Sequence, residues 1–453
     1  MNLTRRLLII SVICFTHSVN ADLRTIAGLS EVQLSLAKSI HDICPKLADK
    51  TDKTTNETNL FFACRAMIQT SNDIQGEGTS TYSLGLSEND LIEALDTIAH
   101  EESATTGSVF TKHPQNLNAT IGNRINQIRT INLRTYTGNI KINNQQLPLI
   151  IFNADENKKS IASALSFYTN GSYNSGGKKS STREDSYDYF SSSILAGADL
   201  RLNNYSFFGA ALSYSYTSAD ITSDSYKNLT ETQGFGSVLY ATFHSRDSYL
   251  SFTINSNSQN IDSKRYVPSI DFQNSSITGA QALKASSAAK TSGFGVSAGH
   301  DNSFGSINFS HYGKLSFQQI YVDAYNENSA NPLALHIDDD KISSFRSTVG
   351  MNLSHIGSYS FGVLTEFLKI EWIHEFENQS RNINASYLYD PFDNPSVFSA
   401  PTEEPDRDFF LVSIGLTTVL PMGTQAFFSY ENTSGMNRIT NHSFVLGARW
   451  ETL

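Results

Sequence analysis

The chain has 453 residues, a formal net charge of −11 at pH 7, 28 Phe and 20 Tyr, but only 5 Met and 3 Cys. The acidic balance argues against a nucleic-acid partner, which requires a basic surface. The sequence lacks a run of about eighteen apolar residues, which argues against membrane-spanning helices, and its aromatic content favours a β protein, either soluble or embedded in a membrane.

Residues 1–21 have the pattern of a secretory signal peptide. Two arginines and a short apolar stretch precede Val19-Asn20-Ala21, which fits a small-residue cleavage site. Cys14 lies inside this segment without the residues typical of a lipoprotein site, so we expect no lipid anchor. Cleavage would remove two arginines and no acid, which changes the net charge from −11 to −13.

Removal of the signal peptide leaves Cys44 and Cys64. Two cysteines in an exported chain favour one disulfide. Closing a loop of about 20 residues stabilises the fold by about 3 kcal/mol in the chain-entropy model. Two buried thiols are the alternative.

Residues 22–135 are predicted to be helical. The stretch LSEVQLSLAKSIHDIC, which ends at Cys44, repeats apolar residues at the spacing of one helix face. A second helical stretch, NLFFACRAMIQ, follows a polar loop, and Ser87 is a predicted N-cap for a third. A fourth stretch, NLNATIGNRINQIRTINLR, carries one stripe of Leu and Ile.

Residues 136–160 form a predicted linker with a short hairpin around Asn143 to Gln146. From residue 161 to 453 the hydrophobic period is two, as in FFGAALSYSYT, where apolar residues alternate with small or polar ones. Twelve segments show this period: 161–176, 186–201, 205–218, 230–245, 247–261, 289–302, 304–325, 341–355, 359–377, 407–420, 423–433 and 441–453.

The connections between these segments alternate between tight turns and long polar stretches such as 262–288 and 378–406. This alternation is typical of an outer-membrane barrel, with short periplasmic turns and longer surface loops. Each segment also has the roughly nine residues that a tilted membrane strand requires. A soluble sandwich is the alternative, because alternation alone permits both.

Two patterns in the second half suggest chemistry but lack its structural context. Gly295–Gly299 reads G-x-S-x-G, but the nucleophile elbow requires a strand, a turn and a helix, and this copy lies within a predicted strand. His374-Glu375 is half of H-E-x-x-H, yet Asn378 replaces the second His. We therefore expect no catalytic residue here.

The acidic run Asp338-Asp339-Asp340 lies in a predicted surface loop. Its carboxylates could bind a divalent cation, but a solvated charge run is the preferred interpretation. We expect no metal and no cofactor.

The stretch KIEWIHEF divides between two faces of one strand. Ile370, Trp372 and His374 alternate with Glu371 and Glu375. In a barrel the first set would face lipid and its aromatic belt, and the two acids would face the lumen together with Arg449. A group of residues that looks catalytic is thus explained as one strand with a lipid-facing side and a lumen-facing side.

Several stretches resemble one family in their order and spacing. These are SSSILAGADLRL, with Gly197 and Asp199 in a G-x-D pattern, ISSFRSTVGMNLS, EWIHEFENQ, PDRDFFLVSIGLTTVL and HSFVLGARW. Residues 161–453 resemble the C-terminal translocator domain of autotransporters. The resemblance implies a twelve-stranded antiparallel barrel in a Gram-negative outer membrane. It also implies insertion by the barrel-assembly machinery, which reads the last strand; here Gly447 and Trp450 fit, and Leu453 replaces the usual Phe.

The first half resembles, more loosely, a two-cysteine helical region found before some such barrels. In that family a helix before the first strand occupies the pore, and residues 114–134 are the candidate. A helix of this length, roughly 30 Å, would cross the barrel. The polar residues of this helix would face lumenal acids such as Glu371 and Glu375. These polar residues are Arg124, Gln127, Arg129 and Arg134. An ordinary helix of a periplasmic bundle is the alternative.

The sequence therefore predicts a membrane anchor that exports its own short N-terminal region, without enzymatic activity. Surface interaction, by adhesion to a ligand or self-association, is the expected role. A plugged outer-membrane pore is the alternative, and a hydrolase with an unrecognised site is the least favoured hypothesis. The expected partners are outer-membrane lipid and the barrel-assembly machinery, not nucleic acid.

Overall fold

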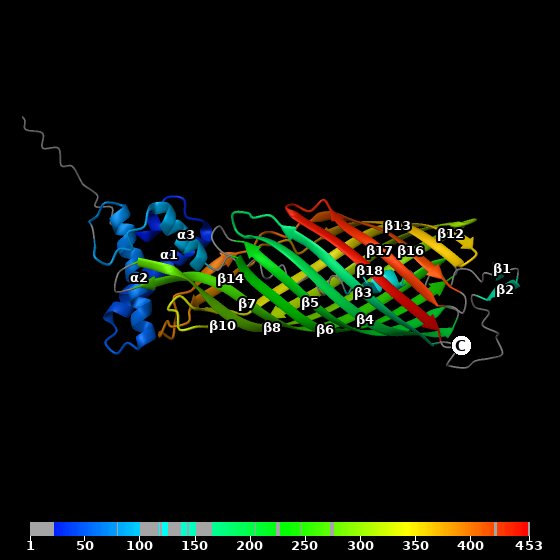
Figure 1. Cartoon of the computed structure of the whole chain (residues 1–453), viewed down its shortest axis with the longest axis horizontal. Coiled ribbons are helices and arrows are strands. Elements are labelled where there is room, and N and C mark those ends of the chain that lie inside the picture. The colour runs from blue at the N-terminus through cyan, green and yellow to red at the C-terminus, as the bar shows by residue number, and fades with distance from the viewer. Residues whose placement is uncertain are drawn as a thin grey trace, which may run out of the picture.

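The structure is a computed structural model. It describes residues 22–78, 80–99, 117, 120–125, 137–142, 145–150, 165–203, 205–222, 227–245, 247–271, 276–420 and 424–451. Three helices lie at one end of a long barrel, and a small hairpin and the C-terminal strand end lie at the other (Figure 1).

The N-terminal helices begin at polar caps. They are η1 (Leu23–Thr25), α1 (Glu31–Asp49), α2 (Thr55–Ile74) and α3 (Glu88–Ile98). Ser30, Thr54 and Ser87 each accept a bond from the backbone N–H three residues on, and that residue's side chain returns a bond to the cap. These capping boxes satisfy amides that have no partner inside the helix, and the predicted cap at Ser87 is confirmed. None of the described helices is long and apolar enough to cross a membrane.

Twelve antiparallel strands close into a barrel, which confirms the predicted fold class. Each strand pairs with the next in the barrel, and β8–β9 and β18–β3 pairing completes the ring. The strands are β3 (Leu165–Lys178), β4 (Ser186–Asn203), β5 (Ser206–Thr222), β6 (Lys227–Ser245), β7 (Ser248–Asp271), β8 (Ser276–Phe304), β9 (Ile307–Val322), β12 (Asp340–Tyr359), β13 (Gly362–Glu375), β16 (Asp408–Val419), β17 (Gln425–Ser434) and β18 (Ile439–Glu451).

The barrel wall is apolar outside and polar inside. Leu212 and Phe235 are 70% and 71% exposed on the outer face, whereas Asn174, Thr217 and Gln259 are buried on the inner face. Because successive strand residues point to opposite faces, the period-two sequence produces this sorting directly.

Two of the predicted polar loops contain strands instead. The connection 326–340 carries most of β10 (Tyr325–Asn328) and all of β11 (Leu335–Ile337), and the connection 378–406 carries β14 (Asn382–Tyr387) and β15 (Phe398–Pro401). They join in the order β10, β11, β14, β15. The sequence did not reveal these strands because their apolar residues pack against the helices, which lie far away in the chain.

The predicted loop 262–288 is also largely strand. β7 and β8 continue past the barrel as one long hairpin, from Arg265↔Leu283 to Asp271↔Ser276, and β10 pairs with β8 at Glu327↔Ala285. The four short strands therefore extend the barrel sheet toward the helices.

A hairpin lies at the far end of the barrel from the helices (Figure 1). It consists of β1 (Thr137–Ile142) and β2 (Gln145–Ile150). Its turn comes earlier than predicted, because Gln145 and Gln146 already pair with Ile142 and Lys141.

Candidate functional site: the barrel lumen and its helical end

A helical segment lies inside the barrel. Residue 117 and residues 120–125 are helical, and Leu117, Ile121 and Ile125 form a buried cluster with side chains of the barrel wall. Those wall residues are Tyr168, Leu195, Phe207, Ala211, Val238 and Tyr240. All of them belong to β3–β6, so the segment is packed against one side of the lumen.

Arg124 anchors this segment to the wall. Its side chain is 1% exposed, and its Nε lies 3.0 Å from Oδ2 of Asp199, with a second, shorter contact from Nη2. Tyr240 donates its hydroxyl proton to the other oxygen of Asp199, and the Tyr168 ring lies 4.7 Å from the guanidinium carbon. Removing one member of such a buried pair would leave an uncompensated charge, which is strongly destabilising.

Two glycines make room for the tyrosines of this cluster. A Cβ on Gly197 would lie 2.5 Å from Tyr168, and one on Gly209 would lie 2.1 Å from Tyr240. The G-x-D pattern at Gly197 and Asp199 is thus the sequence signal for the anchor.

Arg124 was expected to face lumenal acids such as Glu371 and Glu375; it does pair with a lumenal acid, but that acid is Asp199. Arg124 contacts Asp199, 75 residues away in the chain, and strand register rather than local pattern decides which acid faces it. Gln127, Arg129 and Arg134 were also expected to face lumenal acids, and they lie outside the described residues.

A second charged cluster meets the segment from the opposite wall. Lys369 Nζ donates to Asn123 Oδ1 at 3.1 Å and lies 3.3 Å from both Glu371 and Glu431. The hydroxyl of Tyr312 donates to Glu371 at 2.6 Å. Among the described residues, Lys369 thus links Glu371 to the helical segment, a role that sequence reasoning did not assign to it.

Glu375 and Arg449 are both buried on the inner face. Glu375 accepts bonds from Arg346 at 2.7 Å and from the Phe345 amide at 2.9 Å, both on β12, and from the Glu377 amide at 3.2 Å. Arg449 donates to Ser166 at 3.1 Å, and Ser166 lies 3.3 Å from Asp199. Arg449 therefore belongs to the surroundings of the Arg124 anchor.

A cavity of about 190 Å³ remains between the helical segment and the wall that does not pack against it. Gly122 and Ile125 line it on one side, and Lys314, Arg346 and Glu371 line it on the other. The lumen is thus filled asymmetrically, with a dry contact on β3–β6 and a charged space opposite.

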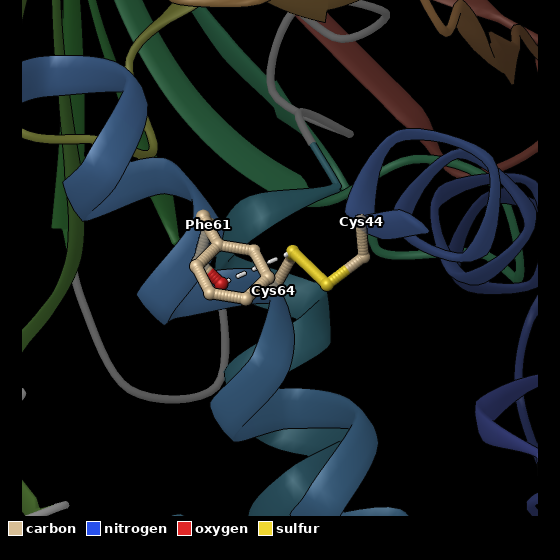
Figure 2. Close-up of a disulfide and its surroundings, with 3 residues drawn as sticks. All are labelled: Cys44, Phe61 and Cys64. Atoms are coloured by element: carbon tan, nitrogen blue, oxygen red, sulfur yellow. Dashed lines mark hydrogen bonds between the residues drawn. A yellow bond between two sulfur atoms is a disulfide. The ribbon is translucent and has the colours of Figure 1, made fainter. Parts of the chain in front are cut away.

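The remaining predicted residues are placed as follows. Cys44 and Cys64 form a disulfide between α1 and α2, which confirms the prediction (Figure 2). Trp450 is 45% exposed on the outer face, and a Cβ on Gly447 would lie 2.1 Å from the Phe427 ring. Leu453 lies outside the described residues.

The two patterns that suggested chemistry both lie within barrel strands. Ser297 lies within β8, opposite Ser251, without the turn and helix of a nucleophile elbow. His374 faces outward and contacts Asp408 at 2.9 Å, and Asp408 also accepts from Trp372 at 3.1 Å. Among the described residues no group of three or more His, Cys, Asp or Glu could hold a metal ion.

The acidic run is partly paired. Asp340 accepts from Arg381, and Asp338 lies 3.5 Å from His336. These contacts favour the interpretation as a charged surface segment.

The helical end of the barrel is closed by a shared hydrophobic core. Residues of α1, α2 and α3 form one buried cluster with Val267, Leu283, Ile383 and Phe398 of the extended strands. No boundary separates a helical core from a barrel-end core, so the two parts bury each other.

Polar contacts fix the orientation of the helices on this end. Arg265 of β7 makes a two-bond ion pair with Glu327, at 2.8 and 2.7 Å, and donates to the Thr97 carbonyl of α3 at 2.8 Å. In α1, Ser39 donates to the Ser396 carbonyl at 2.6 Å. Arg265 is buried, so its charge depends on these partners.

The model of the autotransporter beta-domain matches residues 167–431, which is more than half of the chain. The chain belongs to the autotransporter beta-domain family. Its barrel is therefore of the Gram-negative outer-membrane type, a class assembled by the barrel-assembly machinery. No curated protein matches the sequence.

Three solved autotransporter structures are similar. The translocator domain of NalP from Neisseria meningitidis is 14% identical, with a TM-score of 0.49 and coverage of 66% of this chain and 90% of that one. The beta domain of Bordetella BrkA is 15% identical, with a TM-score of 0.46 and coverage of 64% and 99%. The transport unit of AIDA-I from Escherichia coli is 10% identical, with a TM-score of 0.40 and coverage of 66% and 93%.

Proposed function

We propose that the barrel exports the N-terminal region through its lumen and then holds the helices docked on the cell surface. In this proposal residues 22–135 comprise the exported helices and the lumen segment, residues 136–160 are a periplasmic linker, and residues 161–453 are the anchor. The observation that carries the proposal is the shared core between α1–α3 and the strands at one end of the barrel.

The position of that end supports the assignment. Strands β4 and β5, β6 and β7, β8 and β9, and β12 and β13 are joined by connections of two residues each, all at the end away from the helices. Short connections mark the periplasmic end of outer-membrane barrels. The helices then lie outside, the Arg124 segment inside the lumen, and the β1–β2 hairpin on the periplasmic side, in chain order.

An epitope tag inserted after Asp52, in the exposed connection between α1 and α2, tests this placement. Antibody should bind intact cells that carry this tag. The same tag inserted after Gly305, in the two-residue turn between β8 and β9, should become accessible only after the outer membrane is permeabilised. A tag at Asp52 that also requires permeabilisation would contradict surface exposure.

For surface interaction, an aromatic cluster around Arg65 is the best candidate. The Arg65 guanidinium carbon lies 4.9 Å from the Phe62 ring centre and 3.6 Å from that of Tyr82, which is 46% exposed. Arginine and aromatic residues dominate binding energy at protein interfaces. If this cluster mediates adhesion or self-association, Tyr82→Ala should reduce cell aggregation while Lys38→Ala, an exposed change on α1, should not.

Assembly would depend on the last strand. We propose that Gly447 and Trp450 of β18, together with the C-terminal Leu453, form the signal that the assembly machinery reads. Trp450→Ala should lower the amount of inserted barrel more than Trp372→Ala, an equally large outward change on β13.

A plugged pore is the second candidate, favoured by the segment fixed in the lumen by Arg124 and by the cavity beside it. Deletion of residues 22–135 should raise the conductance of the barrel in a planar bilayer. Equal conductance with and without these residues would exclude a plug role.

A further inference from the structure

The outer face of β8, β9 and β12 carries a row of two lysines with a tyrosine between them. Lys290 lies opposite Tyr321, and Tyr321 lies opposite Lys341, in adjacent strands. All three side chains are exposed, and Lys341 Nζ lies 5.5 Å from the centre of the Tyr321 ring. Since neighbouring strands are about 4.8 Å apart, the two lysine backbones are separated by about 10 Å, and both ammonium groups can reach one anion between them.

The height of this row on the barrel matches a lipid headgroup. A row of three aromatic rings lies four residues closer to the short turns than the lysine row. Four residues span about 13 Å along a strand. Because the strands are tilted, the two rows are about 10 Å apart along the barrel axis. Aromatic rings mark the boundary of the hydrocarbon layer, and lysine side chains extend from that boundary toward the headgroups. The aromatic row is Phe294, Phe317 and Phe345, and the polar row between the two is Ser292, Gln319 and Ser343.

Neither lysine of the row makes an ion pair with a described residue, and the nearest exposed acids on this face of the strands, Asp323 and Asp339, lie two residues farther from the short turns. Within the part of the chain that the structure describes, no carboxylate oxygen lies within 4 Å of either ammonium group. The charge is also local, because the corresponding end of β4 and β5 carries two exposed acids, Asp188 and Asp220, opposite each other. A uniform charged rim that only keeps the barrel soluble would not show this asymmetry.

We propose that Lys290 and Lys341, on either side of Tyr321, bind the phosphate group of a phosphorylated glycolipid in the outer leaflet of the outer membrane; the choice of leaflet rests on the orientation proposed above. The two ammonium groups would make charge-assisted hydrogen bonds to phosphate oxygens. The Tyr321 hydroxyl, which donates to Gln319 Oε1 at 2.6 Å, borders the same space. The apolar wall below the row, including Phe294 and Phe317, would contact the acyl chains, so the geometry fits a lipid rather than a free anion.

Binding of diphosphoryl lipid A to the full-length protein in phosphatidylcholine nanodiscs tests the proposal. Two lysines near an anionic lipid surface together change affinity about 30-fold, so K290Q/K341Q should weaken the apparent Kd by roughly that factor. K38Q/K227Q removes two exposed lysines elsewhere and should leave it unchanged. K290R/K341R keeps both charges and should restore most of the binding, and a heat-dependent gel shift of each variant shows that the barrel is folded.

The lipid and the phosphate are then separated. Lipid A without phosphate should bind the wild-type protein as weakly as diphosphoryl lipid A binds K290Q/K341Q, and millimolar inorganic phosphate should not displace the intact lipid. Equal binding by K290Q/K341Q and the wild type would overturn the proposal, as would equal loss in K38Q/K227Q. Displacement by inorganic phosphate would identify a free-anion site instead, and undiminished binding of the dephosphorylated lipid would show that acyl chains alone are bound.

Discussion

The helical domain and the barrel place the same residue classes in opposite positions. In the helices, Leu36, Ile40 and Leu60 are fully buried among other apolar side chains. In the barrel, Leu212 and Phe235 are exposed on the outside, and the inside is lined by residues such as Asn257 and Thr217. The difference shows that the surroundings decide the arrangement: water surrounds the helices, whereas lipid surrounds the barrel wall and polar side chains line most of the lumen.

Strand β7 crosses the boundary between these two regimes. Its inward face carries Asn255 and Asn257 within the barrel, but Val267 on the same face is fully buried against the helical domain. Strand β7 thus changes from lining the polar lumen to forming part of an apolar core within ten residues of Asn257. We therefore expect that a polar or charged substitution destabilises the apolar core shared with the helices, whereas the polar lumen tolerates it.

The largest effect should follow a charge placed in the dry core. Leu36→Asp buries a carboxylate without a partner, which should destabilise the helical domain by about 5 kcal/mol. Limited proteolysis should then degrade residues 22–99, while the heat-dependent gel shift of the barrel persists. Loss of the barrel as well would show that the two parts fold as one unit.

Arg124→Leu should have the next largest effect, because it leaves Asp199 buried without its cation. The cost should be about 3–5 kcal/mol, measured as a lower denaturant midpoint in detergent. Adding Asp199→Leu removes the uncompensated charge and should recover most of the loss. Equal destabilisation by the single and double variants would contradict an ion-pair anchor.

A matched pair on β13 tests the sorting between lipid and lumen. Ile370→Arg places a charge on the lipid face and should cost about 2–4 kcal/mol near the bilayer centre, with less inserted barrel in membrane fractions. Glu371→Gln, one residue on, keeps a polar group in the lumen and should leave insertion unchanged. Similar losses for both variants would break the two-solvent interpretation.

The smallest effect is a pH dependence in the helical domain. The hydrogen bond from Lys50 holds the pKa of Glu57 below its usual value. A carboxyl group with a lowered pKa stabilises the fold above its unfolded pKa, and this stabilisation is lost as pH falls through the folded value. Thermal unfolding should therefore become slightly easier below about pH 4.5, and less so in Glu57→Gln, whose starting stability is lower.

The twelve barrel strands could be predicted because their signal is local. The alternation in a stretch such as FFGAALSYSYT arises because one face of the strand contacts lipid and the other faces the lumen. All twelve strands occur where this pattern predicts them. The disulfide was predictable for the same kind of reason, since removal of the signal peptide leaves one possible pair in the chain.

The four short strands that pack against the helices, and the ion pair between Arg124 and Asp199, could not be predicted in the same way. β10, β11, β14 and β15 have six residues or fewer, too few for a reliable period, and their apolar residues matter only once the helices cover them. The choice of Asp199 over Glu371 as the partner of Arg124 depends on which wall the segment lies against.

The sequence by itself determined the membrane barrel, the helical character of the N-terminal region and the covalent link between its helices, because each follows from a periodicity or a residue count. Tertiary structure alone decided that the helices share a core with the strands at one end of the barrel, that Arg124 is fixed to Asp199, and that Lys290, Tyr321 and Lys341 align across three strands. These features depend on strand register and closure of the sheet, which bring residues together from distant parts of the chain.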